Sequence, residues 1–325
     1  MRAVVVKEPG GFDALQVEDV PEPRPGEGEV LVEAAFAGCN WADTQVRSGI
    51  YPHAIEYPVI PGFEVSGTVA ELGAGVTGIS VGDRVVAITD TGGYAEKAVT
   101  IAGLVTVLPE NVPLDVAAAF PIQALTGYHM LHTVYQLKKG DVVLVHAAGG
   151  GVGLQTIQLA VHAGARVIGT VGTKGKEKKA LEYGAERVVN LGEDDFVAAV
   201  MEATDGRGAD LAVDSLGAST LDRTFDAVRL LGHVINIGEA EGKPYDNIRD
   251  RILPRSQTFT RLHVGHIMPD PVLWQKGMDY VVKAISDGWL DIPIVDRIPM
   301  ERAREMHEQF EARGVSGKLL LSMER

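Results

Sequence analysis

The chain contains 325 residues, enough for about two domains of typical size, and its 46% hydrophobic and 23% charged residues are those of a globular protein without low-complexity tracts. A formal net charge of −14 argues against nucleic acid or an anionic membrane as a general partner. The single cysteine, Cys39, excludes an intramolecular disulfide, and no secretory signal or apolar run of membrane-spanning length is apparent, so we expect a cytoplasmic protein.

Residues 1–118 are predicted to form a β-rich domain. Short segments of β-type sequence, at residues 30–34, 66–70 and 83–87, are separated by turn signals rich in proline and glycine. This spacing predicts a compact β-barrel.

From residue 119 to residue 262 the pattern changes to alternating strands and helices. Apolar strands are expected at residues 142–146, 166–171, 187–189, 211–214 and 233–237. This alternation is typical of an α/β fold with a doubly wound parallel sheet, which binds ligands at the carboxyl ends of its strands.

The strand at 142–146 continues directly into a glycine-rich turn and then into a helical pattern. Small residues let a dinucleotide pyrophosphate approach the backbone, and the new helix offers free N–H groups and the positive end of its dipole. Alanine (Ala148) stands where the first glycine of G-x-G-x-x-G is expected, so the strand–turn–helix context carries the prediction. The residues expected to bind the dinucleotide are Gly149, Gly150, Gly151, Val152 and Gly153.

The segment after the second strand distinguishes NADPH from NADH. NAD sites commonly place Asp or Glu about 20 residues beyond the glycines, to hold the ribose hydroxyls. Here that position holds Gly169 to Thr173, and lysines follow, which supply positive charge for a 2′-phosphate. We therefore predict NADPH as the cofactor, bound by Lys176 with Gly172 and Thr173, whereas Lys178 and Lys179 fit a solvated helix face.

Residues 263–325 contain a helical stretch at 274–287 and a closing strand at 318–321. We expect them to return to the first domain, because the doubly wound sheet is complete by about residue 262. Residues 1–118 and 263–325 are predicted to form the catalytic and substrate domain, and residues 119–262 the cofactor domain. We expect the active site in the cleft between the two domains. The edge strand near residues 257–262 invites pairing with a second copy, which predicts a homodimer.

Ordered motifs over essentially the whole chain resemble the quinone oxidoreductase (zeta-crystallin-like) branch of the medium-chain dehydrogenase/reductase superfamily. They are Gly38-Cys39-Asn40-Trp41-Ala42-Asp43-Thr44 with Arg47 to Pro52, then Pro61 to Gly67, Gly82 to Val85, Leu125 to Tyr128, His146 to Gly153, Gly169 to Thr173 and Gly317 to Leu321. The resemblance implies a GroES-like β-barrel catalytic domain plus a Rossmann domain, and it also makes a dimer the expected assembly.

The same resemblance argues against zinc. In zinc-dependent alcohol dehydrogenases of this superfamily a cysteine matches Asn40 and a histidine matches Phe63. Asn40 is a poor zinc ligand and Phe63 has no ligand atom, while a catalytic zinc needs about three protein ligands. Glu64 and Asp43 could coordinate a hard cation, but no cluster of oxygen ligands accompanies them. We expect no metal.

The resemblance implies that Asn40, Tyr51, Thr126 and Arg261 line the nicotinamide cleft. The Asn40 amide could hydrogen-bond a carbonyl or a ribose hydroxyl, and the Tyr51 phenol could donate to a reduced oxygen. Arg261 could stabilise negative charge on an acceptor oxygen, and Thr126 could contact the nicotinamide carboxamide. Each residue also has a structural alternative. Asn40 could form a turn and Tyr51 could anchor a packed loop. Arg261 could form a surface ion pair, and Thr126 could be a helix N-cap.

Three further residues are assigned to the cofactor. Ser215 and Gly238 follow the strands at 211–214 and 233–237, and Arg313 matches a family position that can reach the nucleotide phosphate. His266 is a candidate for substrate selectivity. His129 and His132, three residues apart, lack an evident third metal ligand.

Without a Lewis acid to polarise an alcohol, the sequence favours hydride transfer from NADPH to an acceptor that needs little activation. A quinone is the predicted substrate, and α,β-unsaturated carbonyls or enoyl thioesters are the alternative. The alternative from another class is a non-catalytic NADPH-binding protein or an RNA-binding one, and the acidic balance opposes RNA.

Overall fold

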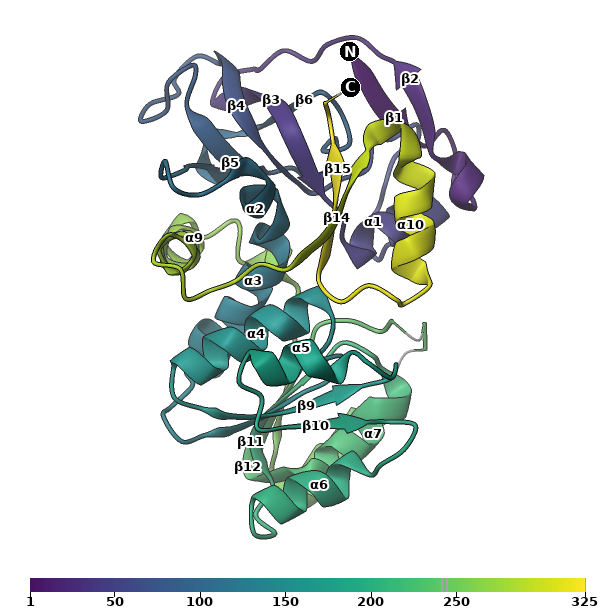
Figure 1. Ribbon diagram of the computed structural model, residues 1–325, viewed down its shortest axis with the longest axis vertical. Coiled ribbons are helices and arrows are strands. Elements are labelled where there is room, and N and C mark those ends of the chain that lie inside the picture. The colour runs from purple at the N-terminus through teal and green to yellow at the C-terminus, as the bar shows by residue number, and fades with distance from the viewer. Residues whose placement is uncertain (241, 244, 325) are drawn as a thin grey trace. The chain divides into compact units, whose positions relative to one another are not determined.

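The computed structural model describes residues 1–240, 242–243 and 245–324 (Figure 1). The chain divides into two compact units, Met1–Gln123 with Met278–Arg325 and Ala124–Gly277. The boundaries expected from the sequence, after residues 118 and 262, remain a prediction for the functional domains.

The second unit is built on a parallel sheet of six strands in the order β10-β9-β8-β11-β12-β13. This is the 3-2-1-4-5-6 order of the Rossmann fold, so the predicted doubly wound sheet is confirmed. The strands are β8 (Val142–Val145), β9 (Arg166–Val171), β10 (Arg187–Asn190), β11 (Ala209–Asp214), β12 (Val228–Asn236) and β13 (Thr258–Arg261).

Helices cover both faces of this sheet, so its central strands need apolar residues on both sides. Figure 1 shows α4 (Gly151–His162) and α5 (Glu177–Glu182) on one face and α6 (Phe196–Ala203) and α7 (Ala218–Ala227) on the other. Every residue of β8 and β11 is buried. The remaining elements are the π-helix η3 (His129–Val134), α8 (Ile248–Ile252), η4 (Leu253–Arg255) and η5 (Val264–His266).

The first unit contains a mostly antiparallel sheet in the order β14-β15-β3-β4-β5-β7, in which β6 also pairs with β3. The last strand pairs with β3 near its end, with Leu320 opposite Gly38, so the carboxyl-terminal segment completes the sheet of the amino-terminal region. The strands are β3 (Glu29–Gly38), β4 (Glu64–Leu72), β5 (Arg84–Ile88), β6 (Lys97–Ile101), β7 (Val105–Val107), β14 (Ile294–Pro299) and β15 (Lys318–Ser322), and β1 (Arg2–Val5) and β2 (Gln16–Asp19) form a separate pair.

Two helices of this unit, α1 (Trp41–Ser48) and α10 (Ala303–Glu311), lie against each other (Figure 1). The other helical elements are α2 (Leu114–Ala119), η1 (Phe12–Ala14), η2 (Ala102–Leu104) and η6 (Met300–Arg302). The boundaries between the units fall inside α3 (Pro121–Tyr128) and α9 (Pro271–Ser286). No helix in the described part of the chain is long and apolar enough to cross a membrane.

The structure corrects the sequence prediction at two elements. Thr126 does not begin a helix: α3 starts at Pro121, a residue well suited to a first helical turn, and Thr126 lies inside it. Strand β12 starts at Val228 rather than at residue 233, because a large bulge separates the pairs Ala209–Val228 and Leu211–His233. Within the bulge Leu231 has a φ of 58° and is 66% exposed, which breaks the apolar pattern expected of a buried strand.

Candidate functional site

The glycine-rich turn connects β8 to α4 in the second unit. The chain turns at Ala147, which has a φ of 50°, and α4 begins at Gly151 with Gly150 as its N-cap. A β-carbon at Gly153 would come within 2.4 Å of the Ala147 carbonyl oxygen, so only glycine fits there. A helix N-terminus that opens at the end of a central strand suits a bound anion.

The alanine in this turn has a packing reason. Ala148 is fully buried, and a β-carbon at Gly169 of β9 would lie 2.7 Å from the Ala148 methyl carbon. Gly169 therefore leaves the space that Ala148 fills. The alanine at position 148 is thus accommodated by a glycine on the neighbouring strand β9, and the turn keeps its course.

Lys176 lies against this turn. A β-carbon at Gly149 would come within 2.7 Å of the Lys176 Cβ, and Lys176 is the N-cap of α5. By contrast, Lys178 and Lys179 each pair with Glu182 at 3.8 Å. Of these three lysines, Lys176 is the one that the fold brings to the predicted phosphate-binding turn. Gly172 and Thr173 lie exposed in the same loop, between β9 and α5.

Ser215 and Gly238 also meet at the carboxyl edge of the sheet. A β-carbon at Gly238 would lie 3.3 Å from the Ser215 carbonyl oxygen, and that oxygen accepts the Ala240 N–H at 3.1 Å. The buried Asp214 carboxylate organises this corner by accepting hydrogen bonds from the backbone N–H groups of Leu216 and Gly217 and from the side chains of Thr220 and Asn236. Asp214 is a supporting residue that the sequence prediction did not include.

Arg261 is the last residue of β13 and lies opposite Asn236 in the parallel register. Its side chain is exposed. Thr126, in α3, is buried.

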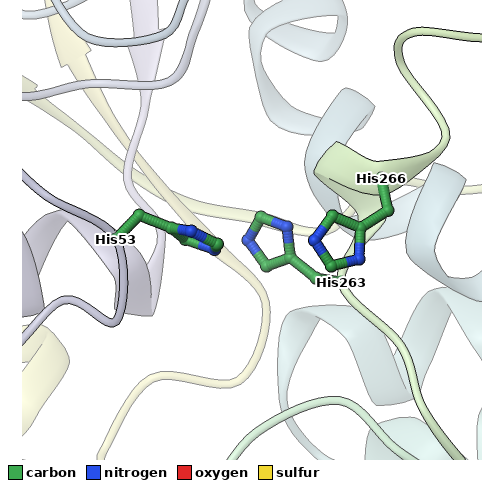
Figure 2. Close-up of side chains that lie close together, drawn as sticks. All are labelled: His53, His263 and His266. Carbon is green, nitrogen blue, oxygen red and sulfur yellow. The ribbon is translucent and has the colours of Figure 1, made fainter.

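Two histidines follow β13 in the same unit. The rings of His263 and His266 lie with centroids 5.3 Å apart and an interplanar angle of 58° (Figure 2). His266 is exposed and His263 is half-buried, so the predicted selectivity residue belongs to an imidazole pair. Figure 2 also draws His53, which belongs to the first unit.

In the first unit Asn40 occupies a buried polar network. Its Nδ2 donates to Glu64 Oε1 at 2.7 Å, and its Oδ1 accepts from Lys318 Nζ at 2.8 Å. Lys318 also pairs with Glu64, and the side chains of both charged residues are 0% exposed. The second carboxylate oxygen of Glu64 accepts the Ile122 N–H at 2.8 Å.

Asp43 extends this network along α1. Its carboxylate accepts the Asn40 backbone N–H at 2.7 Å, the Tyr94 hydroxyl at 3.0 Å and the Gly62 N–H at 3.2 Å. Complete burial raises the pKa of Asp43 to about 7, although these hydrogen bonds favour the charged form. Asp43 and Glu64, which the sequence left as possible cation ligands, are instead engaged by the protein's own donors.

The network reaches α10 through an arginine and a histidine. Arg47 NH1 lies 3.2 Å from His307 Nδ1 and also pairs with Glu311 at 2.8 Å. Because arginine can only donate, Nδ1 must be the acceptor and the neutral ring carries its proton on Nε2, which faces the Tyr94 hydroxyl at 3.5 Å. Burial, with Arg47 alongside, lowers the pKa of His307 to about 3.

Tyr51 lies beside a cleft of about 320 Å³ in the first unit. Its ring is half-buried and packs on Phe63 and His53, with centroids 5.4 Å away in each case. Burial raises the pKa of the Tyr51 phenol to about 12, so the side chain is a neutral hydrogen-bond donor at physiological pH. Arg313 is exposed just after α10, with a φ of 56°.

The two positions that match zinc ligands in the zinc-dependent enzymes are Asn40 and Phe63. Phe63 is an apolar side chain packed into the core of the first unit, and the Asn40 carbonyl oxygen is hydrogen-bonded to an ammonium group. The sequence analysis did not assign a role to Lys318. A lysine directly before three consecutive leucines in a closing strand is nevertheless a signal for a buried, paired charge.

Two family models match the chain. Residues 26–110 match the alcohol dehydrogenase GroES-like domain, and residues 151–284 match the zinc-binding dehydrogenase family. The positions of Asn40 and Phe63 lie in the first of these matches.

Curated relatives and solved structures cover nearly the whole chain. A probable quinone oxidoreductase of Schizosaccharomyces pombe is 35% identical over 98% of this chain and 96% of its own length. A 2-haloacrylate reductase of a Burkholderia species is 32% identical over 98% of both chains. The structure of Escherichia coli quinone oxidoreductase complexed with NADPH superposes with a TM-score of 0.95 at 31% identity, covering 99% of this chain and 100% of that one.

Proposed function

The chain belongs to the zinc-independent quinone oxidoreductase (zeta-crystallin-like) branch of the medium-chain dehydrogenase/reductase superfamily, and on that premise we propose that it transfers a hydride from NADPH to a quinone-type acceptor. The observation that carries the proposal is the full-length similarity to quinone oxidoreductases, joined to a strand–turn–helix with Lys176 against Gly149. The chain is an enzyme of the oxidoreductase class.

The residues of the second unit fit NADPH. The backbone from Gly149 to Gly153 and the start of α4 would hold the pyrophosphate, and Lys176 with Gly172 and Thr173 would hold the 2′-phosphate. Ser215 and Gly238 lie at the strand ends expected to border the nucleotide. We also assign Thr126 to the carboxamide and Arg313 to the phosphates.

When bound, NADPH supplies the hydride. The protein's part is to hold the acceptor, exclude water and stabilise negative charge on the oxygen that gains electrons. We assign an N–H of Asn40 and the Tyr51 phenol as hydrogen-bond donors to that oxygen, and Arg261 as a positive charge that stabilises it. A quinone that accepts a hydride becomes a hydroquinone anion, and water can provide its proton.

Reduction of conjugated carbonyls is the second candidate activity, favoured by the similarity to the 2-haloacrylate reductase. In that reaction a hydride adds to the β-carbon, and the same donors would stabilise the enolate oxygen. The two candidates share the cofactor and differ only in the acceptor.

The test is NADPH oxidation, followed at the nicotinamide absorbance, with metal-free protein and 1,4-benzoquinone, 9,10-phenanthrenequinone and simple enones. Quinone turnover with NADPH that exceeds turnover with NADH supports the proposal. Turnover of enones alone moves the enzyme to the second candidate. Tight NADPH binding without turnover of any acceptor contradicts both and favours a non-catalytic NADPH-binding protein.

We further propose that the enzyme is a cytoplasmic homodimer. Strand β13 is the edge of the six-stranded sheet, and an unpaired edge invites a twofold-related copy. Light scattering should give twice the chain mass of 34.7 kDa. Amide hydrogen exchange in β13 should become faster as the protein is diluted, and a monomer at all concentrations contradicts the proposal.

A further inference from the structure

A lysine with no solvent exposure lies beside the residue assigned to the acceptor. Lys318, the first residue of β15, contacts both Asn40 Oδ1 and the Glu64 carboxylate. These partners are 278 and 254 residues away along the chain. A buried ion pair of this kind contributes little net stability compared with well-packed apolar residues, so stability alone does not explain its presence.

The chemistry of the three side chains determines the direction of the amide. An ammonium group has only donors, so it must face the Asn40 oxygen, and a carboxylate has only acceptors, so it must face the Asn40 nitrogen. A flipped amide would place donor against donor and acceptor against acceptor. The Asn40 orientation therefore follows from Lys318 and Glu64.

The amide nitrogen of Asn40 carries two hydrogens. One of them is donated to Glu64 Oε1, with 2.7 Å between nitrogen and oxygen. Within the described residues the second has no recorded protein partner. An ammonium on the amide oxygen also polarises the amide and strengthens its remaining N–H as a donor.

We infer that Lys318 is a positioning residue for Asn40: with Glu64 it fixes the amide so that one N–H is left to donate to the acceptor oxygen. This inference rests on the proposed function, because it needs an acceptor with a carbonyl or quinone oxygen. It also assigns Asn40 the role of donor to the acceptor oxygen.

The first test is a double-mutant cycle on kcat/KM for duroquinone at saturating NADPH. Lys318→Met removes the ammonium at similar volume, and Asn40→Ala removes the amide. We expect about a 100-fold loss for Asn40→Ala, the scale of removing one donor to a developing oxyanion, and about a tenfold loss for Lys318→Met. If Lys318 acts through Asn40, the double variant loses no more than Asn40→Ala; losses that multiply overturn the inference.

Lys318→Met leaves Glu64 buried and unpaired, which threatens folding. The variant Lys318→Met/Glu64→Gln is neutral and keeps an amide oxygen for Asn40. Its NADPH affinity, measured by nicotinamide fluorescence, should match wild type, because the assigned cofactor residues lie almost entirely in the other unit. A lowered melting temperature with wild-type kcat/KM per folded molecule would reveal a merely structural lysine and overturn the inference.

A measurement on the unmutated site does not depend on these variants folding. In a nitrogen-15 NMR spectrum, the Asn40 Nδ2 signals are assigned by their loss in Asn40→Ala, and duroquinone is added without NADPH. One of the two Nδ2 protons should shift while the one bound to Glu64 stays in place. Two unmoved protons overturn the inference.

Failure of the proposed function can be distinguished from failure of this inference. Wild-type protein that turns over neither quinones nor enones removes the proposed function and this inference with it. Wild-type turnover with a multiplicative cycle removes the inference alone.

Discussion

Lys176 lies directly against Gly149: a β-carbon at Gly149 would come within 2.7 Å of the Lys176 Cβ and 3.1 Å of its carbonyl oxygen. The lysine assigned to the 2′-phosphate therefore lies next to the turn assigned to the pyrophosphate, with no room between them for a β-carbon. The two assignments support each other, and each can be tested by one substitution.

Gly149→Ala should weaken NADPH binding by about tenfold, or about 1.4 kcal/mol. The new methyl group meets a β-carbon and a carbonyl oxygen of Lys176, which cannot move without shifting the backbone. The measurement is the NADPH dissociation constant from nicotinamide fluorescence. Gly103→Ala, where an added β-carbon meets nothing within 4 Å, is the matched control, and equal affinities in the two variants would contradict this packing argument.

Lys176→Ala should raise the dissociation constant for NADPH by about tenfold and leave that for NADH nearly unchanged, because only NADPH carries the 2′-phosphate. The difference should shrink at high salt, since a partly exposed charge is screened. Lys178→Ala removes an 85% exposed lysine paired with Glu182 and serves as the control. Equal losses for both cofactors would refute the assignment of Lys176 to the 2′-phosphate.

Dialysis against a strong chelator should leave quinone reduction unchanged. Phe63 has no ligand atom, and the Asn40 oxygen is hydrogen-bonded to Lys318, so these positions offer no zinc site. Metal analysis of the dialysed protein alongside the NADPH oxidation assay checks this. Activity that is lost on dialysis and restored by added zinc would contradict it.

In the variant His307→Gln, the free energy of unfolding should decrease less steeply as the pH falls than it does in the wild-type protein. The pKa of His307 is lowered to about 3 in the folded protein, against about 6.5 in an unfolded chain, so the unfolded state binds the extra proton as the pH falls between these values. The contribution of His307 to stability is therefore complete above pH 6.5 and decreases toward pH 3. Glutamine keeps an acceptor for Arg47 and a donor toward Tyr94 without titrating.

The measurement is the free energy of unfolding in urea at several values of pH from 7 to 4. The raised pKa of Asp43 acts in the opposite direction over this range, but it is present in both proteins, so the difference between wild type and variant isolates the histidine. Substitution of the exposed His162 by glutamine is the control. Identical slopes for wild type and His307→Gln would show that the buried ring does not govern the acid response.

The parallel sheet and its glycine-rich turn were predictable because their signals are local. Strands such as β8 and β9 are continuous apolar runs, since helices cover both of their faces. The start of β12 was not predictable, because a bulge at Leu231 exposes apolar side chains and interrupts that pattern. Thr126 is not a helix N-cap, because α3 already begins at Pro121, five residues earlier.

The sequence alone determined the glycine-rich turn, because the residues from Gly149 to Gly153 form a short stretch of backbone whose conformation their own types dictate, whereas Lys176 reaches Gly149 only through the pairing of β8 with β9. It could not determine the surroundings of Asn40. Glu64 and Lys318 reach that side chain from β4 and from β15, the last strand of the chain, and only the pairing of β3 with β4 and β15 brings them together. A buried charge is stable only beside its partner, and the choice of partner across 254 residues is made by the sheet.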